Sequence, residues 1–220
     1  MAQLVAFQWL RTRGARDTFM EIDTKVNQEI VNQLYAKNFP GMPPGKFVPG
    51  AGYEQALHAE LMFDYDHLLV IAERFWNLLW VVGRNRTEHP FYTSDEPVVR
   101  RRNPVVNETP QPVAPEVGLE LAFPLNSEFV LVMLDRRMFS PLLPHDRKVL
   151  DFGPDEVERY NTMQVLKSTQ YVFCAKQDFN LAEQLCNAHP VIRDPDRDRA
   201  QVDSVRDQNG MGSISVVVPD

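Results

Sequence analysis

The acidic residues Asp95, Glu120 and Asp135 lie within or directly after short apolar stretches that the sequence predicts to be strands. Carboxylates at neighbouring strand ends can hold a divalent metal that activates water for hydrolysis. Arg100–Arg102 follow Asp95 closely and would lie beside an anionic substrate. These residues therefore predict one kind of chemistry, the metal-dependent, nuclease-like hydrolysis of a phosphodiester, with Asp95 at its centre.

The same stretch, Phe-Tyr-Thr-Ser-Asp-Glu-Pro-Val-Val from Phe91 to Val99, supports a structural interpretation. Short Thr, Ser and Asp side chains hydrogen-bond to nearby backbone and stabilise turns. Asn161, on a predicted helix, would be a buried cap or bridge of the same kind. In this interpretation, which we favour, the polar corner satisfies free backbone amides between two strands.

The sequence gives the catalytic interpretations little support. Against the hydrolase centred on Asp95, no Asp is followed by a Glu-x-Lys strand, and Lys is scarce in the predicted sheet. Ser94 lacks a Gly-x-Ser-x-Gly elbow and a His base tied to it by any pattern. Consecutive strand residues point to opposite faces, so Arg100–Arg102 cannot all hold one anion, and they suit an edge strand protected from pairing. Thr93, Ser94, Arg100 and Asn161 are the candidate binding residues.

Composition limits the class of protein. The 220 residues carry a net charge of −7, which argues against a broad nucleic-acid surface. No apolar run is long enough to span a membrane. Cys174 and Cys186 are the only cysteines, with no Cys-x-x-Cys pair, so we expect reduced thiols in a cytoplasmic protein, and we assign no metal site and no cofactor.

Hydrophobic periodicity predicts helices in the first part of the chain and mainly strands after it. Leu4–Lys37 is expected to be helical with a division near Gly14, the Pro- and Gly-rich segment Phe39–Gly52 to be a loop, and Glu54–Trp76 to be a second helix. Ser140–Gly153 is expected to be irregular. The predicted strands are Leu78–Val82, ended by Gly83, then Phe91–Thr93, Val98–Arg100, Leu119–Phe123, Phe129–Leu134 and Tyr171–Ala175, with further helices at Asp155–Thr169 and Phe179–His189.

These elements predict a single α+β domain over residues 1–190. It would have a mainly antiparallel sheet of about four to six strands, packed helices and an N-terminal helical pair. Residues 1–76 would form the helical part and 77–190 the sheet part, with a proline-rich surface excursion over Pro104–Pro115. Residues 191–220, rich in alternating Asp and Arg, would be a loosely held charged tail.

Four motifs together resemble the mainly bacterial family called domain of unknown function 4238. They are the Thr-Ser-Asp-x-Pro signature within Phe91–Val99, Ala6–Arg13, the paired strands Leu119–Leu125 and Phe129–Leu134, and Tyr160-Asn161. Their order over Leu4–Ala175 follows the family pattern. Two differences are the missing His/Pro/aromatic segment before the first helix and Glu96, where the family more often has Asn. The resemblance supports the fold and brings no established activity.

Two hypotheses about function follow. The first is a cytoplasmic, non-catalytic binding or assembly module, whose partner would be another protein or a second copy of this chain. The second is the phosphodiester hydrolase centred on Asp95, with Glu120 and Asp135. The second requires that the three carboxylates lie together and open to solvent.

Overall fold

A computed structural model describes residues 1–102, 118–194, 197, 201–206 and 212–217. The predicted excursion Pro104–Pro115 lies outside them. The chain divides into two compact units, each described here by itself. Of the described residues, the sheet unit comprises Met1–Arg13, 65–102, 118–194 and Arg197, and the helical unit comprises Gly14–Asp64, 201–206 and 212–217.

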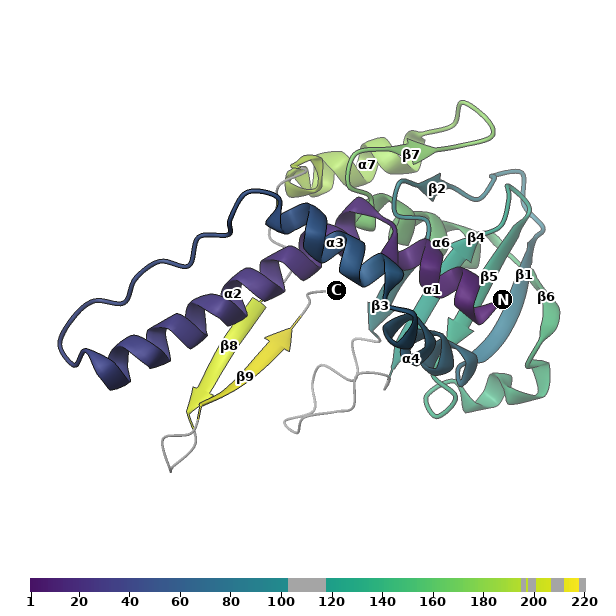
Figure 1. Ribbon diagram of the computed structural model, residues 1–220. Helices are drawn as coiled ribbons and strands as arrows, with labels where there is room; N and C mark the ends of the chain where they lie inside the picture. Colours follow the sequence, from purple (N-terminus) through teal and green to yellow (C-terminus); the bar gives the residue numbers. More distant parts are fainter. Residues whose placement is uncertain (103–117, 195–196, 198–200, 207–211, 218–220) are drawn as a thin grey trace. The chain divides into compact units, whose positions relative to one another are not determined.

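The sheet unit is built on a five-stranded sheet in the order β3-β4-β5-β1-β6 (Figure 1). Only the β1–β6 pair is parallel, and the other neighbours are antiparallel. A separate short pair, β2–β7, is also antiparallel. The predicted α+β class with a mostly antiparallel sheet is therefore confirmed. The strands are β1 (Leu79–Asn85), β2 (Thr93–Ser94), β3 (Val99–Arg102), β4 (Leu119–Pro124), β5 (Phe129–Leu134), β6 (Lys148–Phe152) and β7 (Val172–Phe173).

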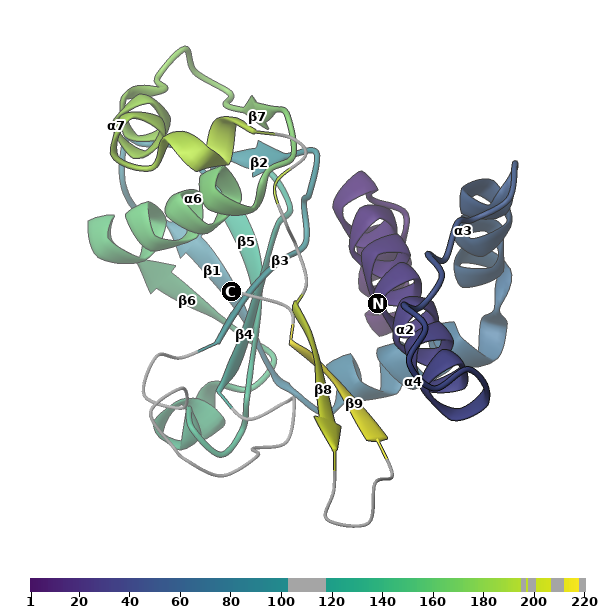
Figure 2. The ribbon, with the colours of Figure 1, turned by 90° about the vertical axis from the view of Figure 1, so that its left-hand side faces the viewer.

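Helices cover both faces of this sheet (Figure 2). Helix α6 (Pro154–Lys167) lies on one face, and α1 (Ala2–Leu10) and α4 (Tyr65–Trp76) lie on the other. Strand β5, apolar at every position, is buried from Val130 to Leu134, because it has helices on both sides. The remaining helical elements are α7 (Asn180–Ala188) and two 3₁₀ helices, η1 (Ser140–His145) and η2 (Pro190–Arg193).

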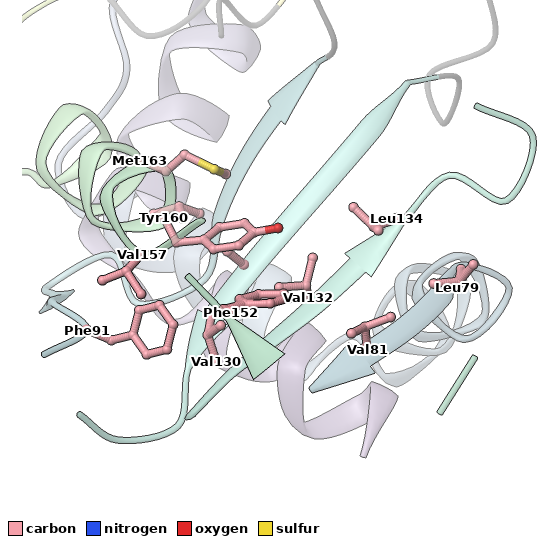
Figure 3. Close-up of a cluster of buried hydrophobic side chains, with 12 residues drawn as sticks. Leu79, Val81, Phe91, Val130, Val132, Leu134, Phe152, Val157, Tyr160 and Met163 are labelled. Carbon is pink, nitrogen blue, oxygen red and sulfur yellow. The ribbon is translucent and has the colours of Figure 1, made fainter. Parts of the chain in front are cut away.

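Tyr160 and Met163 of α6 pack against the sheet in the main hydrophobic core (Figure 3). Helix α6 begins with Pro154 at its first position, and the Glu156 carboxylate accepts the Gly153 N–H at 2.9 Å. At its other end Arg197 donates to the carbonyls of Leu166 and Ser168, at 3.1 and 2.8 Å. The core residues are Leu79, Val81, Phe91, Val99, Ala122, Val130, Val132, Leu134, Phe152, Val157, Tyr160 and Met163.

The helical unit contains α2 (Arg13–Asn38), α3 (Tyr53–Phe63) and a hairpin of β8 (Gln201–Arg206) and β9 (Gly212–Val217). The hairpin lies in the segment predicted to be a charged tail. The predicted Phe39–Gly52 loop connects α2 to α3 without regular structure. Gln28 of α2 holds this loop, since its side chain donates to the Gly45 carbonyl at 3.0 Å and accepts the Phe47 N–H at 2.7 Å.

Two predicted boundaries were wrong. Glu54–Trp76 is not one helix: it divides at Asp64, whose backbone is extended, into α3 and α4, which belong to different units. Ser140–Gly153 is not irregular, because it contains η1 and the edge strand β6. Most of β6 is exposed, so its sequence shows no alternation of apolar and polar residues.

Gly83 does not end its strand as predicted, because β1 continues to Asn85. Glycine is required there by packing. A Cβ at position 83 would lie 2.1 Å from Cε2 of Phe152, whose ring stacks on Tyr160 with centroids 5.7 Å apart. The missing side chain therefore makes room for the ring between β1 and α6.

Gly83→Ala should lower the free energy of unfolding by about 1–3 kcal/mol, because the buried Phe152 ring must move. Urea unfolding followed by tryptophan fluorescence measures this, since Trp9, Trp76 and Trp80 all lie in the sheet unit. Gly50→Ala, whose Cβ would meet nothing within 4 Å, is the control and should stay within about 0.5 kcal/mol of wild type. A Gly83→Ala protein as stable as wild type would refute this packing role.

Candidate functional site

The polar corner, residues Pro90–Pro97, joins β1 to β3 and contains the candidate residues of the sequence motif. Its short strand β2 pairs with β7, Thr93 opposite Phe173 and Ser94 opposite Val172. Thr93 is half-buried and Ser94 is buried. The corner thus lies between the main sheet and the segment that follows α6, and only two of its residues have strand partners.

The carboxylate of Asp95 binds the turn that follows α6. It accepts the backbone N–H groups of three consecutive residues: Thr169 at 2.9 Å, Gln170 at 2.7 Å and Tyr171 at 3.3 Å. The Asp95 N–H in turn donates to the Tyr171 carbonyl at 3.1 Å. Both carboxylate oxygens are therefore engaged by protein donors, in the way that an N-cap carboxylate accepts backbone N–H groups at the start of a helix.

Behind Asp95, Ser94 and Gln164 of α6 form a buried network. The Ser94 hydroxyl lies within donating distance of two acceptors, Gln164 Oε1 at 2.8 Å and the Glu96 carbonyl at 2.9 Å. Its oxygen accepts the Glu96 N–H at 3.2 Å. Gln164 Nε2 donates to the Pro97 carbonyl at 3.1 Å. The buried Glu96 carboxylate accepts the Thr169 hydroxyl at 3.0 Å. The network satisfies polar groups that burial would otherwise leave without partners.

Asn161 of α6 bridges the start of the corner. Its Oδ1 accepts the Tyr92 N–H at 2.7 Å, and its Nδ2 donates to the Pro90 carbonyl at 3.0 Å. Asn161 is 3% exposed, so water does not replace either bond. Tyr92 itself donates its hydroxyl to the Asp178 carbonyl at 2.7 Å, and burial raises the pKa of this hydroxyl to about 12.

Asp135 performs a similar task at the end of β5. Its carboxylate accepts the N–H groups of Gly118 at 2.9 Å, Arg137 at 3.1 Å and Met138 at 3.4 Å. The side chain is almost completely buried. It therefore closes the turn after β5 and ties it to the start of β4.

Glu120 on β4 is the buried centre of a charged cluster, the Glu120 cluster, with the half-buried Arg101 and Arg159 and the buried Tyr160. Arg101 on β3 donates to Oε2 at 3.0 Å, and Arg159 on α6 donates to Oε1 at 2.7 Å. The Tyr160 hydroxyl also donates to Oε1, at 3.0 Å. Burial and the charge of Glu120 raise the pKa of Tyr160, so that this hydroxyl stays protonated.

The three candidate carboxylates do not converge. Glu120 lies within β4 and binds Arg159 of α6, whereas Asp135 follows the end of β5 and binds the N–H groups of the turn there. Asp95 lies instead against the turn after α6. Among the described residues, no group of three or more His, Cys, Asp or Glu side chains is placed to hold a metal ion.

The arginines alternate as the strand geometry predicts. Arg100 lies over the Trp9 ring of α1, 5.8 Å from its centroid, whereas Arg101 points to the other face and binds Glu120. Arg100 therefore does not join Thr93, Ser94 or Asn161. No helix within the described residues is long and apolar enough to cross a membrane.

Sequence reasoning missed the residues of α6 that complete these networks, Gln164 and Arg159, as well as Glu96 and Thr169. A signal for Gln164 existed. Val157, Tyr160, Asn161 and Gln164 recur at three- and four-residue steps, so the two amides occupy positions of the buried face. Amide side chains on an apolar stripe indicate a buried hydrogen-bond partner.

Asn161→Ala should lower the free energy of unfolding by about 2–4 kcal/mol, because it leaves the Tyr92 N–H and the Pro90 carbonyl buried without partners. Asn161→Asp preserves the size and the acceptor, yet an ionised carboxylate cannot donate to Pro90, so it should also destabilise the chain. Urea unfolding measures both, with the exposed Asn77→Ala as control, expected within about 0.5 kcal/mol of wild type. Equal stability of the Asn77 and Asn161 variants would contradict the bridging role.

No curated protein matches the sequence significantly, and no solved structure does so either. A family model described as "Protein of unknown function (DUF4238)" matches residues 1–178, which include α1, the polar corner, the Glu120 cluster and α6. The chain therefore belongs to the DUF4238 family of proteins of unknown function.

Proposed function

We propose that this protein is a non-catalytic binding or assembly module of the DUF4238 family. The observation that carries the proposal is the saturation of the candidate carboxylates. Asp95 and Asp135 each accept three backbone N–H groups, and Glu120 accepts two guanidinium groups and one hydroxyl. Groups bound in this way stabilise the fold and are not available to activate water or hold a metal.

The geometry argues against the hydrolase alternative on two further grounds. Glu120 lies within β4 and binds Arg159 of α6, whereas Asp135 follows the end of β5 and binds the turn there, and both are buried. A two-metal or one-metal phosphodiester site needs carboxylates that converge on one solvent-accessible point. Ser94 is likewise hydrogen-bonded within the corner, to Gln164 and Glu96, and no His ring is among the partners of its hydroxyl.

The proposed module acts in the cytoplasm, with another protein or a second copy of the chain as partner. The two cysteines, Cys174 and Cys186, are both free thiols, which suits a reducing compartment. The net charge of −7 disfavours a broad nucleic-acid surface.

Incubation of the protein with DNA or RNA and Mg²⁺, Mn²⁺ or Zn²⁺ should give no cleavage above a blank without protein. Calorimetric titration with the same three ions should show no stoichiometric binding, because the carboxylates are already engaged. Both measurements use the full chain at neutral pH.

The proposal is contradicted by metal-dependent cleavage that disappears in Asp95→Asn. The variant must retain native tryptophan fluorescence, and cleavage must persist in the control Asp151→Asn. Asp151 is a suitable match because its carboxylate is exposed and pairs with Arg84 on β1 and with Arg86 just after it, and not with the corner.

A further inference from the structure

The Glu120 cluster contains more donors than its carboxylate uses. Arg101 and Arg159 each contact Glu120 through a single terminal nitrogen, Nη2, one on each carboxylate oxygen. A guanidinium has five N–H donors in a planar fork. Arg159 Nη2 also lies 2.8 Å from the Tyr160 hydroxyl oxygen, so one nitrogen of this side chain serves both contacts.

The Nε atoms of both arginines are buried and have no hydrogen-bond partner in the part of the chain that the structure describes. A buried donor without an acceptor destabilises the folded chain. Two such donors, on the two arginines that share Glu120, indicate that the cluster can take an additional acceptor. Both side chains remain 37% exposed, so their outer edges are open to solvent.

Glu120 holds both arginines of the cluster in place. The two guanidinium groups share this one carboxylate, and the Glu156 carboxylate also acts electrostatically on Arg159. Glu120 is 1% exposed and binds an arginine from β3 and one from α6, so it holds two side chains from different elements at fixed positions. Preorganised arginines lose little conformational freedom when they bind an oxyanion.

We propose that Arg101 and Arg159 form a binding site for a phosphate group, with Glu120 as the residue that positions them. Phosphate suits the pair because its several oxygens can accept donors from two forks at once. A ligand carboxylate would offer only two oxygens, the arrangement that Glu120 already supplies. The inference rests on the proposed function, since the phosphate is bound and not cleaved.

The source of the phosphate is either free phosphate or a small phosphomonoester. A single arginine pair on a chain of net charge −7 does not match the row of phosphates along a nucleic-acid strand. Titrations with inorganic phosphate and with adenosine monophosphate distinguish the two sources. If groups beyond the phosphate also contact the protein, adenosine monophosphate binds more tightly than inorganic phosphate.

Calorimetry of the full chain at low salt should detect binding of at least one of these two probes. Arg159→Lys and Arg101→Lys should each weaken it about tenfold or more, because lysine retains the charge that balances Glu120 and loses the fork. Arg84→Lys, on the exposed pair with Asp151, is the matched control and should leave the affinity unchanged. Native tryptophan fluorescence verifies that each variant is folded.

A second measurement needs no variant. Phenylglyoxal modifies accessible arginines, and phosphate should slow the modification of Arg101 and Arg159 several-fold, as read by mass spectrometry, without protecting Arg84. Failure of both probes to bind or to protect overturns this inference and leaves the non-catalytic module standing. Metal-dependent cleavage that requires Asp95 would overturn the proposed function instead, whether or not phosphate binds here.

Discussion

The structure of the sheet unit depends on one constraint: backbone groups at both ends of the polar corner are buried or half-buried beyond the reach of the β2–β7 pair. The Tyr92 N–H and the carbonyls of Pro90 and Pro97 are bonded by side chains of α6, namely Asn161 and Gln164. Each such group left without a partner costs about 1–3 kcal/mol, so the corner and the helix are stable only together. Sheet and helix are joined here by amide side chains as well as by hydrophobic contact.

Helix α6 therefore has three tasks. Tyr160 and Met163 pack into the core, Asn161 and Gln164 satisfy the corner, and Arg159 reaches the carboxylate on β4. The Asp95 carboxylate also holds the turn that follows the helix, by accepting the N–H groups of Thr169 and Gln170. Because these contacts share a single helix, the position of Arg159 depends on the packing of the corner, which links the polar corner to the proposed phosphate site.

The sequence was sufficient for much of this. The Thr-Ser-Asp corner predicted side chains bonded to backbone, and the structure has this for Ser94 and Asp95; the all-apolar β5 predicted burial on both faces. Other features depend on tertiary partners that no local pattern contains. Asp64 interrupts a continuous helical periodicity where the chain passes from one unit to the other, and Gly83 is explained only by the ring of Phe152, 69 residues later. The role of Glu120 likewise depends on Arg159, from an element 39 residues away.

Hydrogen exchange at single amides tests the central claim most directly. The Tyr92 N–H donates to a side chain and not to a strand, and the Thr169 and Gln170 N–H groups donate to Asp95. If the corner exists to satisfy these groups, the Tyr92 amide should exchange as slowly as those of the central strand β5, through unfolding of the sheet unit. Exchange of Tyr92 at the rate of an exposed loop, with β5 still protected, would show an open corner whose side chains are free for chemistry, and would contradict the account.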